Sequence, residues 1–288
     1  MIFNLANQFL SVKTSAAGGE IVSIVQRGTE YIKRSFDVLD GWAFNLFPVI
    51  GRLNQGVYRY KGGVFKLPKN GFLNKVMFEV SSYDKDSVTY EFKYDEFTLK
   101  AYPFKFLFSV NYKLIKNQIQ ITYKITNLDN KPMYFCLGAK PGFNVPLNNQ
   151  LSFSDYYLEF EQGASIKKLN LDSSYLLNGK QEPFELQGGI LPLRHRLFDN
   201  GAIILADAPK SIALKSKYDS KSVKITYPYM KYLSLWKPPK IDTPMICLEG
   251  WTGLPSYNYK IDDIQTKEEI IKLNIGEEYI NAWSIEIN

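Results

Sequence analysis

The sequence predicts an all-β fold, a large antiparallel β-sandwich with very little helix, for three reasons. Aromatic residues make up 15% of the 288 residues, mostly as 20 Tyr and 19 Phe, which suit pleated sheet surfaces. Apolar and polar residues alternate with a period of two in several segments, whereas helical periodicity is nearly absent. Turn-like clusters rich in Gly and Pro separate these segments. Because no low-complexity linker divides the chain, we expect a single domain over residues 1–288.

The longest alternating stretch lies in the first half of the chain. Apolar side chains occupy every second position over residues 87–92 and again over residues 104–114. Residues 116–117 form a turn signal, and the alternation resumes over residues 119–125. We therefore predict a long hairpin with one face against the core and the other face in water.

Shorter strands are expected along the rest of the chain. They are predicted at residues 133–137, 202–205, 222–226, 245–248 and 282–287. Turns are predicted at residues 61–63, 187–189 and 237–239. Helix is expected only as one or two short turns.

The composition limits the chemistry that the chain can perform. A hydrophobic share of 45% and a charged share of 22% exclude disorder for the chain as a whole. Two cysteines cannot form a disulfide scaffold or a tetrathiolate metal site, and we expect Cys136 and Cys247 to be buried, reduced thiols. His195 is the only histidine and is expected in an exposed loop, so a site with two imidazoles is excluded. Carboxylates, Lys, Arg and Tyr must therefore carry most of the chemistry.

The charge balance is moderately basic, with 35 Lys and Arg against 29 Asp and Glu and a formal net charge of +6. One stretch without any acid contains Arg52, Arg59, Lys61, Lys66, Lys69 and Lys75. These residues could contact nucleic-acid phosphates, but no nucleic-acid-binding motif accompanies them. Solvated loops and edge strands explain the lysines more simply, so no nucleic-acid partner is expected.

The sequence also bears on where the protein functions. No apolar run approaches the ~18 residues that a membrane helix requires, and no membrane partner is expected. The first residues lack the cationic and apolar regions of a signal peptide. Together with the expected free thiols, these features predict a cytoplasmic protein.

Two charged residues that follow predicted buried strands are candidate site residues. Alternation places Cys247, Glu249 and Trp251 on one face of a strand with two apolar faces. A buried, unpaired carboxylate is unstable, so Glu249 requires a cation, hydrogen-bond donors or a ligand. Lys140 ends another predicted buried strand, directly before Pro141. A structural ion pair for Glu249 and a solvent-reaching Lys140 are the simpler alternatives, and both remain open at this point.

Several segments occur in the order typical of one known family. They are residues 19–24, 28–32, Trp42 with 46–53, 233–236, and 247–251. Through these segments the chain resembles the aldose 1-epimerase (galactose mutarotase) family, especially its bacterial LacX-like branch. The resemblance extends over nearly the whole chain and implies a galactose mutarotase-like β-sandwich with a sugar as its ligand.

The resemblance implies that the protein interconverts the α and β anomers of a free sugar. In the family, a Glu removes the proton of the anomeric hydroxyl while a His protonates the ring oxygen, and the opened ring recloses as the other anomer. Glu249 corresponds to this base, and Arg52, Asn70 and Trp236 are expected to position the sugar. Neither a metal nor an organic cofactor is expected, because the reaction requires only proton transfer.

The chain departs from the family at the two positions where histidines are expected. Lys140 replaces one His in a Gly-Gly-His-Pro-type motif, and Asn70 replaces the other in a His-Gly-Phe motif. An acidic residue expected before the Trp236 strand is also missing, and Tyr227 lies there instead. Lysine binds its proton too tightly for rapid exchange near neutrality, whereas asparagine can hydrogen-bond a sugar but cannot titrate.

Three functions therefore remain open. The first is a mutarotase with Glu249 as base and Lys140 as acid or electrostatic partner. The second is a sugar-binding or sensing protein that uses the same cleft without efficient catalysis, and the third, suggested by the basic residues 52–75, has a phosphorylated sugar as its ligand. In each case we expect Lys140 and Glu249 to form an ion pair, because neither charge is stable alone in an aromatic-lined cleft. The identity of the sugar and the oligomeric state stay open.

Overall fold

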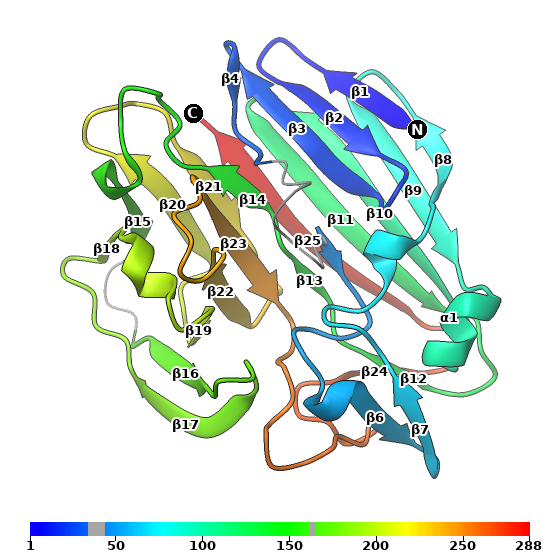
Figure 1. The fold of residues 1–288 in the computed structure, drawn as a ribbon. Coiled ribbons are helices and arrows are strands. Elements are labelled where there is room, and N and C mark those ends of the chain that lie inside the picture. The colour runs from blue at the N-terminus through cyan, green and yellow to red at the C-terminus, as the bar shows by residue number, and fades with distance from the viewer. Residues whose placement is uncertain (34–43, 162–164) are drawn as a thin grey trace.

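A computed structural model describes residues 1–33, 44–161 and 165–288, and these form two large antiparallel sheets packed face to face (Figure 1). In the described residues the larger sheet has nine strands. Their order is β18 (Ile190–Pro192), β15 (Tyr156–Phe160), β20 (Ser211–Ser216), β21 (Val223–Thr226), β25 (Glu278–Ile287), β11 (Gln118–Asn127), β10 (Phe106–Ile115), β9 (Ser87–Lys93) and β8 (Glu79–Tyr83).

The second large sheet has eight strands in the same described ranges. Seven follow the order β17 (Leu177–Pro183), β16 (Lys167–Leu171), β19 (Ile203–Ala206), β22 (Tyr232–Trp236), β23 (Met245–Trp251), β13 (Gly138–Ala139) and β5 (Asn45–Leu46). The eighth, β14 (Gly142–Asn144), also pairs with β23. The short strands β13 and β14 both pair with β23, and in the sequence they are separated only by Lys140 and Pro141.

The remaining elements are small. A four-stranded N-terminal sheet orders β1 (Ile2–Ala6), β2 (Ser11–Ser15), β3 (Glu20–Gln26) and β4 (Thr29–Glu30). Two further strand pairs join β6 (Val57–Tyr60) with β7 (Gly63–Lys66), and β12 (Met133–Phe135) with β24 (Ile271–Leu273). Four 3₁₀ turns occur in the described part of the chain: η1 (Asn54–Gly56), η2 (Leu73–Lys75), η3 (Phe153–Asp155) and η4 (His195–Phe198).

Among the described residues one α-helix occurs, α1 (Glu96–Ala101), six residues long. Its N-terminus is capped by Asp95, whose carboxylate accepts a 2.7 Å hydrogen bond from the Thr98 N–H. The Thr98 hydroxyl in turn accepts a 2.9 Å hydrogen bond from the Asp95 N–H. This reciprocal capping stabilises a helix that the alternation pattern did not locate.

The hairpin predicted from the alternation is the pair β10 and β11, joined by a turn in which Lys116 has a φ of 54°. Apolar side chains such as Phe108 and Ile125 lie opposite each other and face the core. Residue 104, which the pattern included in this strand, lies before it, because β10 begins at Phe106. The predicted all-β antiparallel sandwich with very little helix is confirmed.

The apolar residues form two clusters on opposite sides of the eight-stranded sheet. The larger cluster contains side chains of both large sheets, for example Tyr123 of β11 and Leu248 of β23, and is the core between them. The smaller cluster contains Leu46, Ile204 and Trp251, which lie on the other face of the smaller sheet. Because this outer face is itself apolar, charged side chains placed on it lose much of their contact with water.

Candidate active site

The pairing of β22 with β23 places several functional side chains on the outer face of the eight-stranded sheet. Ser234 lies directly opposite Glu249, and Trp236 lies opposite Cys247. Directly opposed residues of antiparallel strands project to the same face. The predicted alternation of β23 is confirmed, because Leu248, on the other face, belongs to the main core.

The position of Glu249 within its strand differs from the prediction. The apolar run suggested that the strand ends at Leu248, but β23 continues to Trp251, so Glu249 lies inside the sheet. Its side chain is only 2% exposed, and its Oε2 accepts a 3.1 Å hydrogen bond from the indole N–H of Trp251. Burial raises the pKa of Glu249, and the positive charges of Lys140 and Lys69 oppose that shift.

Lys140 approaches Glu249 from the interruption between β13 and β14. Its backbone N–H donates to the carbonyl of Phe44, and Pro141 then ends the ladder. The Lys140 Nζ lies 3.6 Å from Glu249 Oε1 and 3.9 Å from the centre of the Trp236 ring. The expected ion pair is present, and with Lys140 only 4% exposed it is buried rather than solvent-reaching.

Asn70 holds the loop that presents Arg52. Asn70 has a φ of 65°, a left-handed conformation that asparagine tolerates well. Its Oδ1 accepts a 2.8 Å hydrogen bond from the Gly51 N–H, and its own N–H donates to the Gly51 carbonyl. A Cβ on Gly71 would lie 1.8 Å from the Phe47 oxygen, so only glycine fits after Asn70. The Asn70 amide nitrogen takes part in neither of these two hydrogen bonds.

All five residues proposed from the sequence line one cavity of about 50 Å³: Arg52, Asn70, Lys140, Trp236 and Glu249. They come from segments as distant in the sequence as the loop that follows β5 and strand β23, and β13 pairs with both of these strands. The arrangement combines a buried carboxylate, a buried ammonium and an aromatic ring. It can exchange a proton with a ligand and stabilise negative charge that develops on it.

Further residues line the cavity that the sequence analysis did not single out as site residues, among them the polar side chains of Lys69, Tyr175 and Ser234. Ser234 is fully buried, and its hydroxyl has no hydrogen-bond partner within the described residues. The period-two alternation that identified Glu249 applies equally to residues 232–236 and could have identified Ser234 beside Trp236. No local pattern indicates Tyr175, because it lies in the turn between β16 and β17.

Lys69 is an exposed residue whose ammonium group lies at the edge of the cavity, 5.6 Å from the centre of the Trp236 ring. Burial of this end of the side chain lowers the pKa of Lys69 to about 8, and repulsion by Lys140 and Arg52 adds to the shift. Glu249 acts in the opposite direction. Arg52 is also exposed, and its guanidinium lies 5.7 Å from the centre of the Tyr175 ring.

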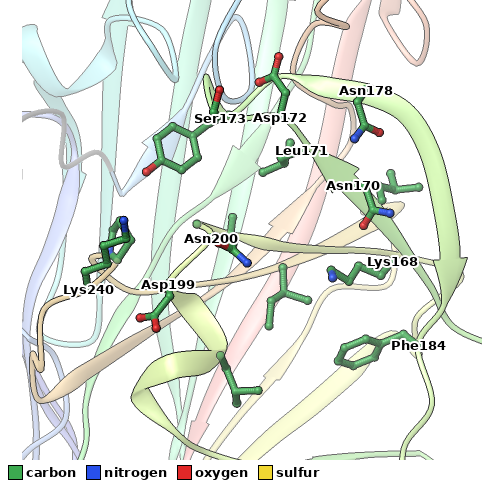
Figure 2. A pocket seen from close by; sticks show the side chains of 17 residues that line it. Lys168, Asn170, Leu171, Asp172, Ser173, Asn178, Phe184, Asp199, Asn200 and Lys240 are labelled. Atoms are coloured by element: carbon green, nitrogen blue, oxygen red, sulfur yellow. The ribbon is translucent and has the colours of Figure 1, made fainter.

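A larger cavity of about 720 Å³ adjoins the small one, and Figure 2 shows the side chains that line it. Leu171, Tyr175 and Ala202 border both cavities. Ligand pockets for small molecules typically enclose about 300–1,000 Å³, so the small cavity alone does not hold a whole monosaccharide. A sugar whose anomeric end reaches Glu249 must therefore extend towards the larger cavity.

Other residues considered in the sequence analysis lie elsewhere. His195 is not exposed in a loop as expected but half-buried in η4, where it stacks on Phe153 with ring centres 4.2 Å apart. Packing against that ring, which the local polar sequence does not reveal, explains the difference. Tyr227 is buried with its hydroxyl donating to the Pro209 carbonyl, and Trp42 lies outside the described residues.

The two cysteines are buried and are not joined by a disulfide. Burial raises the pKa of Cys136 to about 11 and that of Cys247 further, so both remain thiols near neutral pH. Residues 1–33, 44–161 and 165–288 contain no group of three or more His, Cys, Asp or Glu side chains arranged to hold a metal ion. None of the helices in these ranges is long and apolar enough to span a membrane.

The fold and this cavity define a class of protein, the galactose mutarotase-like β-sandwiches. A galactose mutarotase-related enzyme from Lactobacillus acidophilus superimposes with a TM-score of 0.91 at 25% identity, covering 100% of this chain and 97% of that one. A galactose mutarotase-like protein from Lactobacillus casei superimposes with a TM-score of 0.90 at 28% identity, covering 100% of both chains.

Sequence comparison identifies the family to which the chain belongs. The profile of the aldose 1-epimerase family matches residues 1–260, and the chain belongs to this family. The chromosomal protein LacX of Lactococcus lactis subsp. lactis is 29% identical over 284 residues, which cover 95% of each chain. The family resemblance drawn from the sequence segments is thereby confirmed.

Proposed function

We propose that the protein binds a monosaccharide in the Glu249 cavity and interconverts its α and β anomers. The observation that carries this proposal is the buried pair of Lys140 and Glu249, 3.6 Å apart in a cavity also lined by Arg52, Asn70 and Trp236. Membership of the aldose 1-epimerase family supports the same reaction.

In the proposed reaction Glu249 is the general base. Its carboxylate removes the proton of the anomeric hydroxyl, the bond between C1 and the ring oxygen breaks, and C1 becomes a carbonyl carbon. The Lys140 ammonium donates a proton to the ring oxygen as its negative charge develops. Rotation about the C1–C2 bond and the reverse proton transfers then close the ring as the other anomer. Because burial raises the pKa of Glu249, its carboxylate is a stronger base than an exposed one.

Arg52, Asn70 and Trp236 hold the sugar in this proposal. The carbonyl oxygen of Asn70 is used by the Gly51 N–H, so Asn70 contributes its amide nitrogen as a donor to a sugar oxygen. Trp236 offers an aromatic surface, part of which is covered by the Lys140 ammonium.

A sugar-binding or sensing protein without efficient catalysis is the second candidate. The Lys140 ammonium is attracted both by Glu249 and by the Trp236 ring, so it can serve as a fixed positive charge that holds a ligand. This arrangement suits binding as well as it suits catalysis. The two candidates make different predictions for a single assay.

Polarimetry of freshly dissolved α-glucose and α-galactose distinguishes the candidates. The mutarotase is expected to accelerate the approach to anomeric equilibrium, and Glu249→Gln is expected to reduce this acceleration by about 10²–10⁴-fold. Glu249→Asp keeps the negative charge and tests the reaction if Glu249→Gln is unstable. Glu278→Gln, which removes a carboxylate from the exposed pair with Lys124, is the matched control. Sugar binding without acceleration would support the second candidate instead.

A further inference from the structure

The charges around the small cavity do not balance. Its lining contains three basic residues, Arg52, Lys69 and Lys140, and one acidic residue, Glu249. The ion pair with Glu249 neutralises Lys140. Among the described residues, neither Arg52 nor Lys69 has a carboxylate within ion-pair distance. Within the described part of the chain, two positive charges therefore remain unbalanced at the edge of a site whose interior pair is neutral overall.

Holding like charges together at the edge of the cavity is unfavourable. Burial is the main cause that lowers the pKa of Lys69 to about 8, and repulsion from Lys140 and Arg52 adds to it. Aromatic rings offer Lys69 and Arg52 only weak partners, at 5.6 Å and 5.7 Å from the ring centres. An anion between the two groups would relieve the repulsion and form charge-assisted hydrogen bonds.

A second, independent observation indicates that the ligand also carries hydroxyl groups. The Ser234 hydroxyl is fully buried, lines the same cavity and has no hydrogen-bond partner among the described residues. A buried polar group without a partner is destabilising by about 1–3 kcal/mol, so such groups are usually satisfied when the site is occupied. Ser234 lies opposite Glu249 in the sheet, where a hydroxyl near the anomeric carbon would reach it.

The charges that line the larger cavity indicate that the anionic part of such a ligand binds at the small cavity instead. Its charged lining residues are balanced, with Lys168 and Lys240 against Asp172 and Asp199 (Figure 2). The excess positive charge is therefore confined to the small cavity and its edge. Arg52 contacts the ring of Tyr175, which borders both cavities, so Arg52 lies near their junction.

We infer that the ligand of this cavity is an anionic monosaccharide, a sugar phosphate or a sugar acid, whose negative group is bound by Arg52 and Lys69. Its anomeric end contacts Glu249 and Lys140, and one of its hydroxyl groups contacts Ser234. The inference rests on the proposed sugar site and specifies its substrate class. It also accounts for two exposed basic side chains that the proton-transfer reaction does not require.

Calorimetric titration of the full chain with matched sugars tests this inference. The probes are glucose, glucose 6-phosphate and glucuronate, the three galactose counterparts, and inorganic phosphate alone. At low salt, at least one anionic sugar is expected to bind at least about tenfold more tightly than its neutral parent, as one charge-assisted hydrogen bond would provide. The comparison of phosphate with carboxylate identifies which anion the site prefers.

Single substitutions test which side chains cause the preference for an anionic sugar. In Lys69→Gln and in Arg52→Gln, the ratio of anionic to neutral sugar affinity is expected to fall about tenfold. Lys66→Gln is the matched control, because Lys66 is an exposed lysine of the same basic stretch that does not line the cavity. That variant is expected to leave the ratio unchanged.

Each contrary outcome is distinguishable. Equal affinities for neutral and anionic sugars would overturn this inference while the sugar site and its mutarotation stand. A fall in Lys66→Gln as large as in Lys69→Gln would show only unspecific charge attraction. If inorganic phosphate bound as tightly as the sugar phosphates, the site would recognise the phosphate group alone and not the sugar. If none of the six sugars binds, the proposed function fails together with the inference.

Discussion

Lys140 and Glu249 form a buried ion pair, with 3.6 Å between Nζ and Oε1, although 108 residues separate them in the sequence. Lys140 lies between two short strands that both pair with β23, and Glu249 lies within β23 itself. Each charge is therefore stable in its apolar surroundings only because the other is present. This dependence has consequences for stability as well as for chemistry.

The first prediction concerns stability. Lys140→Met and Glu249→Gln are each expected to lower the free energy of unfolding by about 3–5 kcal/mol, because each leaves the other charge buried without a partner. The double variant is expected to lose much less than the sum of the two. Urea unfolding of the four proteins measures the coupling, and strictly additive losses would show that the two side chains do not depend on each other.

The second prediction concerns the missing imidazoles. Lys140→His is expected to raise the rate of mutarotation, because imidazole exchanges a proton near neutral pH far more readily than an ammonium group. Adding Asn70→His is expected to raise it further, provided that the His nitrogen accepts the hydrogen bond that Asn70 now accepts from Gly51. Polarimetry measures both effects. A double variant that binds sugar but stays inactive would direct attention to the acid missing near Tyr227.

The third prediction concerns Ser234. Ser234→Ala is expected to reduce sugar affinity about fivefold, which corresponds to roughly 1 kcal/mol, without lowering the free energy of unfolding, because the hydroxyl has no hydrogen-bond partner among the described residues. Ser216→Ala is the matched control, since the Ser216 hydroxyl donates to the Asp155 carbonyl. That control is expected to lose about 1 kcal/mol of stability and no sugar affinity. The reverse pattern would assign Ser234 a structural role only.

The fourth prediction concerns pH. The pKa of Lys69 is lowered to about 8, so Lys69 is positive below pH 8 and becomes neutral above it. Affinity for an anionic sugar is therefore expected to be highest below pH 8 and to fall by about tenfold in all as Lys69 becomes neutral above it. A sugar phosphate is suited to this measurement, because its second pKa of about 6 lies below the range.

The groups that face Lys69 determine the control for this measurement. They are Lys140, Glu249, Arg52 and Cys247. The buried Cys247 stays a thiol because its pKa is raised. Lys69→Gln is expected to remove the decline above pH 8. A decline of the same size in Lys69→Gln would show that Lys69 is not the group that titrates.

Much of the architecture could be predicted from local patterns. The alternation over residues 104–125 predicted the pair β10 and β11, since a strand with one buried face must place apolar side chains at every second position. Helix α1 was not located because six residues are too few to show a helical period. The half-buried position of His195 was missed because it depends on contact with the distant Phe153.

By itself, the sequence determined that the chain forms an antiparallel β-sandwich and that Cys247, Glu249 and Trp251 share one face of a strand. It also determined which residue types were available for chemistry, since a single histidine excludes a pair of imidazoles. Only the tertiary structure decided that Lys140 neutralises Glu249, and that Lys69, Arg52 and the buried Ser234 hydroxyl have no ion-pair or hydrogen-bond partner of these kinds among residues 1–33, 44–161 and 165–288. Alternation is a property of neighbouring residues, whereas ion pairing and burial depend on which distant strands come to lie side by side.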